Sequence, residues 1–266
     1  MDRYAVVGNP IEHSKSPLIH AMFAEQTGQQ LEYGKLLAPL DNFIGSVRDF
    51  LREGRGVNVT VPFKEQAWAL VDEHTPAAER AGAVNTILRR EDGSLLGDNT
   101  DGKGLVRDIE INAGLSLKGL SVLLVGAGGA ARAAVHALGQ VFAEVRIINR
   151  TPARAEALIA AVQPHSPALL VHRDAVTDAA LIVNALSVPP ELDLTTLAPD
   201  AVLMDMTYRP LMTGFLRAGA ERGHTVVDGL AMLIGQAQPS FATLFGVAPP
   251  DMDVRAEALR VLGGRA

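Results

Sequence analysis

The chain has 266 residues, of which 48% are hydrophobic and 20% are charged, and its formal net charge is −6. This composition is typical of a globular protein with room for two domains, and it excludes an intrinsically disordered chain. The absence of Cys excludes disulfides, thiolate catalysis and cysteine metal sites. The negative balance, without a cluster of Lys or Arg, argues against a nucleic-acid partner. Any anionic ligand must therefore be held by local cations and helix N-termini.

The N-terminus and one uncharged stretch bear on where the protein works. The chain begins with charged residues and passes directly into a predicted strand, which leaves no room for a signal peptide, so we expect a cytoplasmic protein. Residues 229–250 carry no charge and are nearly long enough to cross a bilayer. Because Gln236, Gln238 and Ser240 lie inside this stretch, it favours a buried amphipathic helix, and we expect no membrane partner.

The first hundred residues alternate between strand and helix patterns. Short apolar strands are predicted at residues 4–7, 31–37 and 57–61, and a helix pattern follows each of them. This order predicts a small α/β domain.

Two loops of this domain contain polar residues that local structure does not fully explain. Ser16 before Pro17 reads as an N-cap, but Ser14 and Lys15 have no such role. The two serine hydroxyls and the Lys15 ammonium form a candidate cradle for a carboxylate and hydroxyls. A capped surface loop fits the same spacing. Lys64 falls in the first turn of a helix, where an anion is preferred. It reads either as an acid-base group or as a surface lysine.

The next segment supplies a carboxylate. Residues 81–87 predict a turn into a strand, and Asp92-Gly93 predicts a hairpin that returns the chain to residues 97–102. Asp101 reads as a helix cap or as the partner that Lys64 lacks locally. A helix over residues 104–113 then leads into the second domain.

The stretch 122–132 organises the second domain. A buried strand ends in Gly126, Gly128 and Ala131, the small-residue pattern of a dinucleotide-binding turn, although an ordinary tight turn has the same pattern. The next strand, residues 145–148, ends without the acidic residue of NAD enzymes. Arg150 and Arg154 flank the following helix start instead, which favours the 2′-phosphate of NADP over two solvated surface charges.

Three further parallel strands are predicted at residues 181–185, 201–206 and 225–229, followed by a helix from residue 230 and another over 253–262. Because the carboxyl ends of such strands face the ligand, Asn184, Met206, Tyr208 and Gly229 are candidates for the nicotinamide end. The predicted fold is α/β with two domains. A substrate-binding domain spans 1–101 plus 230–266, with the C-terminal helices returning to it, and a Rossmann-like, doubly wound NADP-binding domain spans 102–229.

Several motifs occur in order along the chain. They are Gly8-Asn-Pro with Ser14-Lys-Ser-Pro17, Asn58-Val-Thr-Val-Pro-Phe-Lys64, Gly82-Ala-Val-Asn-Thr86, Gly97-Asp-Asn-Thr-Asp-Gly102, Gly126-Ala-Gly-Gly129, Asn149-Arg-Thr151 and Asp228-Gly-Leu-Ala-Met. Together they resemble the shikimate dehydrogenase family. The resemblance implies NADPH-dependent, reversible reduction of 3-dehydroshikimate to shikimate, in the pathway to chorismate and the aromatic amino acids.

The resemblance also implies roles for single residues. Lys64 and Asp101 would be the catalytic pair. The substrate-binding residues would be Ser14, Ser16, Thr60, Lys64, Asn85, Asp101, Tyr208 and Gln236. The cofactor-binding residues would be Gly126, Ala127, Gly128, Gly129, Ala130, Asn149, Arg150, Thr151, Arg154, Met206, Gly229 and Met232.

The chain departs from the family pattern in two places. Residues 186–190 lack the usual threonine and glycine, which stiffens this loop and removes one cofactor contact. Pro239 is expected to interrupt and kink the helix near Gln236.

Two alternatives to an NADP-dependent shikimate dehydrogenase stay open. One is an NAD-preferring quinate or shikimate dehydrogenase, and the other is a non-catalytic ligand-binding protein of the same fold. The histidines show no metal-ligand spacing, so no metal is expected. The expected assembly is a monomer or a homodimer.

Overall fold

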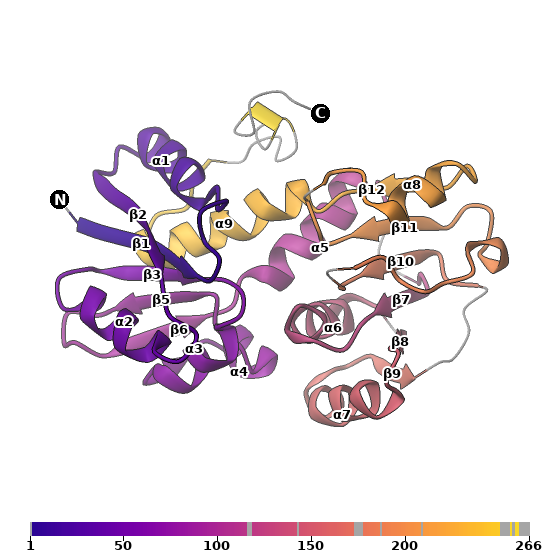
Figure 1. The fold of residues 1–266 in the computed structure, drawn as a ribbon, viewed down its shortest axis with the longest axis horizontal. Coiled ribbons are helices and arrows are strands. Elements are labelled where there is room, and N and C mark those ends of the chain that lie inside the picture. The colour runs from indigo at the N-terminus through magenta and orange to yellow at the C-terminus, as the bar shows by residue number, and fades with distance from the viewer. Residues whose placement is uncertain are drawn as a thin grey trace. The chain divides into compact units, whose positions relative to one another are not determined.

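The computed structural model describes residues 2–115, 119–142, 144–172, 178–186, 188–208, 210–250, 256 and 259–260. The chain divides into two compact units, which Figure 1 shows as ribbons. Unit 1 comprises Met1–Asp101 and Gln236–Arg265, and unit 2 comprises Gly102–Gly235. The boundary between residues 235 and 236 falls inside the helix Leu230–Phe245, not at its start. The predicted helix over 253–262 lies largely outside the described residues.

Unit 1 is built on a mixed sheet with the strand order β2-β1-β3-β5-β6-β4. Its strands are β1 (Asp2–Gly8), β2 (Leu31–Leu37), β3 (Gly56–Val59), β4 (Glu73–His74), β5 (Thr86–Arg89) and β6 (Leu95–Asp98). Its helices are α1 (Ser16–Thr27), α2 (Phe43–Leu51), α3 (Lys64–Leu70), α4 (Pro76–Ala81) and the later part of α9 (Leu230–Phe245). The predicted hairpin is confirmed, since β5 and β6 pair antiparallel and Gly93 adopts a φ of +88° in the turn between them.

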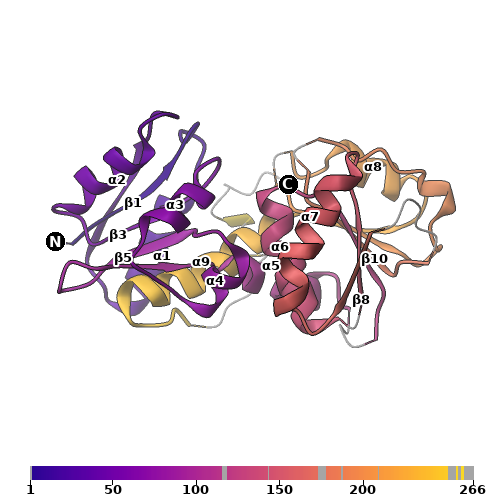
Figure 2. The same ribbon diagram turned by 90° about the horizontal axis from the view of Figure 1, so that it is seen from below.

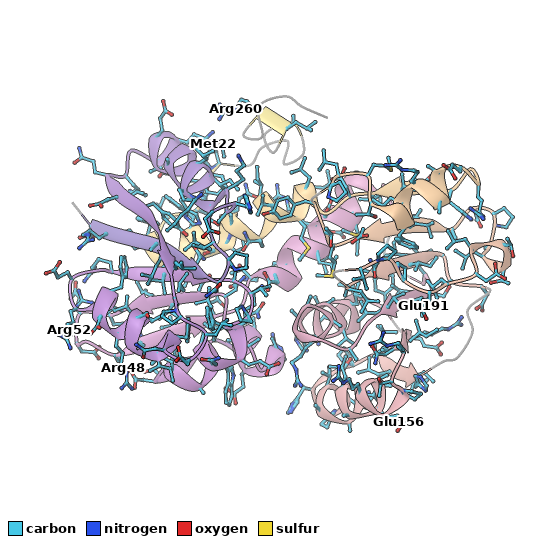
Figure 3. The ribbon with its side chains drawn as sticks, in the orientation of Figure 1. Met22, Arg48, Arg52, Glu156, Glu191 and Arg260 are labelled. Carbon is cyan, nitrogen blue, oxygen red and sulfur yellow. The ribbon has the colours of Figure 1, made fainter. Side chains whose placement is uncertain are left out.

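Helices cover both faces of this sheet. Successive side chains of a strand point to opposite faces, so neighbouring residues of β1 pack against different helices. Ala5 and Val7 of β1 belong to a core formed with α2, α3 and α4. On α2, Phe43, Val47 and Leu51 are buried at a spacing of four residues. Arg48 and Arg52 lie on the outside of this helix (Figure 3).

The neighbouring residue Tyr4 points to the other face of the sheet. Its ring lies 4.4 Å from that of Phe245 of α9. Phe23 of α1 lies 5.6 Å from Phe241 of α9, between ring centroids. The last turns of α9 therefore complete the core of unit 1.

Unit 2 is built on a parallel sheet with the strand order β12-β11-β10-β7-β8-β9. Its strands are β7 (Val122–Val125), β8 (Glu144–Ile148), β9 (Leu169–His172), β10 (Leu181–Asn184), β11 (Val202–Asp205) and β12 (Thr225–Val227). Its helices are α5 (Asp101–Asn112), α6 (Gly129–Val141), α7 (Pro152–Val162), α8 (Gly214–Ala220) and the first turns of α9, with short 3₁₀ turns at Gln163–His165 and Leu194–Thr196. The predicted doubly wound α/β fold is confirmed.

The central strands of this sheet are buried on both faces, which explains the apolar runs of β7, β10 and β11. Val122 and Leu124 face α5, α6 and α7, whereas Leu123 and Val125 face α8. Figure 2 shows α6 and α7 side by side on one side of β8 and β10. Two strands, β9 and the two-residue β4, were not predicted from the sequence.

The uncharged stretch 229–250 contains α9, as predicted. Pro239 lies inside this helix, but α9 continues through it to Phe245, so the predicted interruption is wrong. Proline removes one N–H from the helix ladder, and the packing of Phe241 and Leu244 against unit 1 offsets this local loss. In the described ranges, no helix is long and apolar enough to cross a membrane.

Candidate active site

Lys64 and Asp101 form an ion pair in unit 1. Lys64 is the first residue of α3, and Asp101 is the first residue of α5. The Lys64 Nζ atom donates to Asp101 Oδ2 over 2.6 Å, and the two side chains are 26% and 11% exposed. A carboxylate is favourable at a helix N-terminus, whereas an ammonium is not, so Asp101 compensates for the position of Lys64. The structure thus holds an ammonium at a fixed place while leaving it partly accessible.

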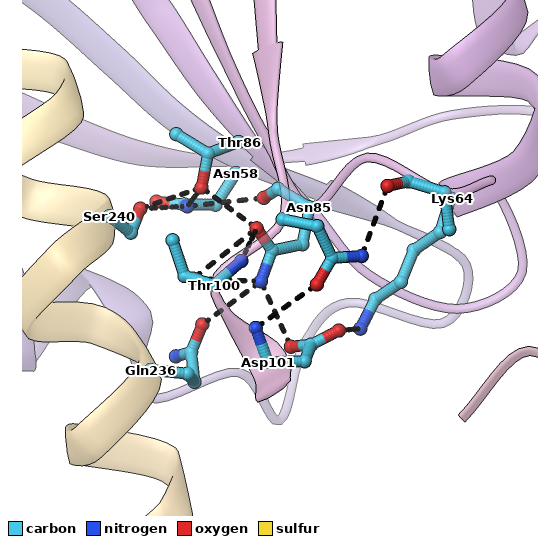
Figure 4. Close-up of polar contacts among 10 residues, drawn as sticks. Asn58, Lys64, Asn85, Thr86, Thr100, Asp101, Gln236 and Ser240 are labelled. Carbon is cyan, nitrogen blue, oxygen red and sulfur yellow. Dashed lines mark hydrogen bonds and ion pairs between the residues drawn. The ribbon is translucent and has the colours of Figure 1, made fainter. Parts of the chain in front are cut away.

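Asn85 connects this pair to its surroundings, as Figure 4 shows. Its Nδ2 atom lies 2.9 Å from Asp101 Oδ1, 2.9 Å from Thr100 Oγ1 and 3.5 Å from Gln236 Oε1. Its Oδ1 atom accepts a hydrogen bond from the Thr100 amide over 3.1 Å. Asn85 is 3% exposed, so its amide orientation is set by protein groups. Four predicted residues, Lys64, Asn85, Asp101 and Gln236, therefore meet in one polar group.

Ser14 and Ser16 lie close together at the start of α1. The Ser14 hydroxyl lies 3.2 Å from that of Ser16 and accepts from the Ser16 amide over 3.3 Å. The predicted N-cap role of Ser16 is wrong, because α1 begins at Ser16 and Lys15 occupies the cap position without a side-chain bond. The Ser14 hydroxyl thus accepts from the first amide of α1, whereas the Ser16 hydroxyl makes no capping bond within the described residues.

Thr60 lies at the end of β3, where its amide donates to the Val7 carbonyl over 2.9 Å. Its methyl group lies against Gly8, since a Cβ on Gly8 would be 2.5 Å from Thr60 Cγ2. Across the described residues, no hydrogen bond joins Ser14, Ser16 or Thr60 to Lys64, Asp101 or Asn85. These three residues share unit 1 with the ion pair but are not bonded to it.

In unit 2, the turn after β7 has the geometry of a phosphate-binding loop. Gly126 has a φ of +117°, which strongly favours glycine, and its amide donates to the Ile148 carbonyl over 2.8 Å. Gly128 occupies the N-cap of α6 without a side-chain cap, and a Cβ on Gly128 or Gly129 would meet nothing within 4 Å. Residues 128–130 are exposed. The first residues of this helix of 13 residues are thus exposed, and no side chain caps their amides.

The turn after β8 lies next to this loop in the sheet. Asn149 donates from Nδ2 to the Thr151 carbonyl over 2.8 Å, which fixes the start of α7. Arg150, Thr151 and Arg154 are exposed. Within the described part of the chain, neither arginine is in an ion pair, so both guanidinium groups are available to an anion.

Met206, Gly229 and Met232 also belong to unit 2. A Cβ on Gly229 would lie 2.5 Å from the Met206 carbonyl oxygen, so only glycine allows the two backbones to approach this closely. Met232 is 8% exposed and packs in the core, and its amide donates to Asp108 Oδ2 over 3.1 Å. Tyr208 is half-buried in unit 2, whereas the other predicted substrate-binding residues lie in unit 1.

Comparison with known proteins shows the family of this chain. Residues 6–87 match the shikimate dehydrogenase substrate binding domain, and residues 109–191 match the shikimate / quinate 5-dehydrogenase family. A relative from Alkalilimnicola ehrlichii, named shikimate dehydrogenase (NADP(+)), is 50% identical over 97% of this chain and 98% of its own length. The chain belongs to the shikimate dehydrogenase family.

Two solved structures share the fold of this chain. The shikimate 5-dehydrogenase of Thermus thermophilus, in complex with NADP(H) and shikimate, superposes with a TM-score of 0.87 at 37% identity, covering 98% of this chain and all of that one. An Ael1 enzyme from Pseudomonas putida superposes with a TM-score of 0.84 at 39% identity over 98% of both chains. The predicted family and fold are confirmed.

A group of polar residues behind Asn85 was not predicted from the sequence. Asn58 donates from Nδ2 to Ser240 Oγ over 2.6 Å and to Thr86 Oγ1 over 3.1 Å, and it accepts at Oδ1 from the Tyr33 hydroxyl over 2.5 Å. Thr86 in turn lies 3.0 Å from Asn85 Oδ1. One sequence signal exists, since Asn58 is a lone amide in a valine-rich strand, and such a residue must find partners when it is buried.

Proposed function

We propose that this chain is an NADP-dependent shikimate dehydrogenase, which interconverts 3-dehydroshikimate and shikimate in the route to aromatic amino acids. The observation that carries the proposal is the ion pair of Lys64 and Asp101, held by Asn85. The relatives named shikimate dehydrogenase (NADP(+)) support the same activity and the same cofactor.

The pair fits acid-base catalysis of ketone reduction. When bound, NADPH supplies the hydride that the ketone carbon accepts. The Lys64 ammonium donates its proton to the ketone oxygen as negative charge develops there, which yields the hydroxyl of shikimate. In the reverse direction, neutral Lys64 takes the proton from that hydroxyl. Asp101 keeps the Nζ atom in place and compensates its charge.

We assign the recognition of the substrate to the polar residues of unit 1 together with Tyr208. Ser14 and Ser16, with Tyr208, bind the carboxylate, because the two serine hydroxyls lie 3.2 Å apart at the start of α1 and hydroxyls can donate to a carboxylate. Thr60, Asn85, Asp101 and Gln236 bind the ring hydroxyls. Asn85, Asp101 and Gln236 offer both donors and acceptors within one hydrogen-bonded group, which suits a polyhydroxylated ring.

We assign NADP to unit 2, whose residues fit it. The uncapped amides at Gly128, Gly129 and Ala130, next to Gly126 and Ala127, form a cradle for the pyrophosphate. Arg150 and Arg154, with Asn149 and Thr151, lie at the end of the adjacent strand and suit the 2′-phosphate. Met206, Gly229 and Met232 are assigned to the nicotinamide end.

We also propose that residues 1–101 with 230–266 form the substrate domain, that 102–229 form the NADP domain, and that the protein works in the cytoplasm as a monomer or homodimer. Size-exclusion chromatography with light scattering measures the assembly. Cell fractionation tests the compartment.

The activity is tested by following reduced-nicotinamide absorbance with shikimate or quinate and with NADP⁺ or NAD⁺. We expect fast reduction with shikimate and NADP⁺. Equal efficiency with NAD⁺ would contradict the assignment of the arginines, and a preference for quinate would favour the related dehydrogenase. Folded protein that binds NADPH without turnover would favour a non-catalytic ligand-binding protein.

A further inference from the structure

A buried carboxylate lies at the end of β11, outside the residues assigned above. Asp205 is 2% exposed and accepts three hydrogen bonds. The donors are Asn184 Nδ2 over 3.1 Å, Thr213 Oγ1 over 2.8 Å and the Thr207 amide over 2.9 Å. Three donors stabilise a buried charge that would otherwise be costly to desolvate. Asp205 therefore joins residues of three different segments of unit 2.

The first segment leads to the phosphate-binding loop. Asn184 is 1% exposed, and its Oδ1 atom accepts from the Leu186 amide over 3.2 Å. The Leu186 side chain packs directly on Gly126, because a Cβ on Gly126 would lie 2.9 Å from Leu186 Cδ2. The sequence makes Asn184 a candidate for the nicotinamide end. In the structure, its side-chain amide bonds to Asp205 and to the Leu186 backbone amide. Leu186 stands where the family usually has threonine. The Asp205 carboxylate thus holds, through Asn184, the backbone of a residue that departs from the family pattern.

The second and third segments lead to the turn after β11. Asp205 holds the Thr207 amide, and the Met206 carbonyl between them is the atom against which Gly229 packs. Thr213 caps α8 by accepting from the Leu216 amide over 3.3 Å, while its hydroxyl proton goes to Asp205. The same carboxylate therefore sets the backbone on both sides of the Met206 turn.

The sheet topology indicates which part of a dinucleotide would lie over the turn at Met206. The strand order reverses at β7, with β8 on one side and β10, β11 and β12 on the other (Figure 1). A dinucleotide crosses the carboxyl edge at such a reversal. Since Arg150 and Arg154 follow β8, the 2′-phosphate end lies on that side, and the nicotinamide end lies over β10 and β11.

We propose that Asp205 is a positioning residue for the nicotinamide half of the cofactor. It holds the Leu186 backbone through Asn184 and the Met206–Thr207 turn directly, so that both sides of the nicotinamide site keep one geometry. This inference rests on the proposed function for the identity of the cofactor, but not on turnover.

The test uses variants that reverse one donor and one acceptor. Asp205→Asn turns an amide donor toward the donor of Asn184, and Asn184→Asp turns a carboxylate toward that of Asp205. The exchange Asn184→Asp with Asp205→Asn restores the bond between the two side chains, and the new carboxylate still accepts from the Leu186 amide, but the Thr213 hydroxyl loses its acceptor. The control is Asp193→Asn, because Asp193 also accepts from a threonine amide and hydroxyl, at 3.0 and 2.6 Å, but is exposed.

Binding of NADPH is compared with that of adenosine 2′,5′-bisphosphate, which lacks the nicotinamide, by calorimetry on the full chain without substrate. We expect Asp205→Asn to raise the Kd of NADPH about tenfold, the effect of one lost hydrogen bond. The Kd of the bisphosphate should stay within about twofold, and the exchange variant should bind NADPH more tightly than either single variant.

Unchanged NADPH affinity, or equal weakening of both ligands, would overturn the inference, because a general loosening of unit 2 affects both halves of the cofactor. If Asp205→Asn does not fold, Asn184→Ala is measured in the same way, with the same split expected and the same results counting against it. If Asp205→Asn weakens NADPH binding alone but the wild-type protein does not oxidise shikimate, the proposed function is refuted and the inference stands. Wild-type protein that binds no NADPH would overturn both.

Discussion

His20 makes the stability of unit 1 depend on pH. The ring is 1% exposed and is stacked on Tyr33 with the centroids 4.4 Å apart, and it lies near Phe23 and Phe241. Among the described residues its Nδ1 atom has no hydrogen-bond partner. Burial lowers the pKa of His20 from 6.5 to about 3, so the folded protein keeps this ring neutral at pH 5.

The size of the effect follows from proton linkage. Below pH 6.5 the unfolded chain binds a proton at His20 while the folded chain does not, so stability falls as pH falls until the folded pKa of about 3 is reached. Between pH 7 and pH 5 the expected loss is about 2 kcal/mol, at about 1.4 kcal/mol for each pH unit below 6.5. Tyr33 does not contribute here, because burial raises its pKa well above 10.

The assay is urea unfolding at pH 7 and pH 5, for the wild type and for His20→Phe, which keeps an aromatic ring among aromatic neighbours. Trp68, the one tryptophan of the sequence, lies in unit 1 and reports its unfolding by fluorescence. Because all other groups titrate equally in both proteins, the wild type should lose about 2 kcal/mol more than the variant. Equal losses in the two proteins would refute the reasoning.

Three further predictions concern the sites and the fold. Lys64→Ala should lower kcat by about 10² to 10⁴-fold in steady-state assays while NADPH still binds, and a smaller loss would remove Lys64 from the acid-base role. Replacing Arg150 and Arg154 by Ala should lower the ratio of kcat/KM for NADP⁺ over NAD⁺ by about tenfold or more, and an unchanged ratio would mean that neither contacts the 2′-phosphate. Gly229→Ala places a Cβ 2.5 Å from the Met206 oxygen and should destabilise the protein by about 1 to 3 kcal/mol in urea unfolding. Gly34→Ala is its control, because a Cβ there meets nothing within 4 Å and should change stability by about 0.5 kcal/mol or less.

The sequence predicted the sheet of unit 2 well because its strands are buried on both faces. β7 is an unbroken apolar run and β10 is apolar up to its last residue, Asn184, and short runs of this kind are typical of buried parallel strands. β9 was missed because Leu169 is exposed and the strand has no clear pattern. The effect of Pro239 was overestimated because a local rule does not include the packing of the residues that follow it.

Within the site, the sequence indicated the residues Lys64 and Asp101 but not their contact in space. Lys64 and Asp101 were notable because each lies at a helix start, where charge has a local cost or benefit that can be judged from spacing. Their contact spans 37 residues and depends on the sheet order, which places β5 beside β3 and β6 beside β5. No local pattern contains that order, so the ion pair stayed a hypothesis until the fold was known.

Asn58 and Asp205 were harder to predict for a different physical reason. Each acts through another polar residue, Asn58 through Thr86 on Asn85 and Asp205 through Asn184 on Leu186. In a buried cluster every donor must face an acceptor, because an unmatched group keeps its full desolvation cost. One side-chain orientation is therefore selected by several neighbours at once. A sequence shows each polar residue singly, whereas the matching that fixes its orientation exists only in the fold. Exchanging donor and acceptor within such a pair should accordingly be tolerated better than changing either residue alone.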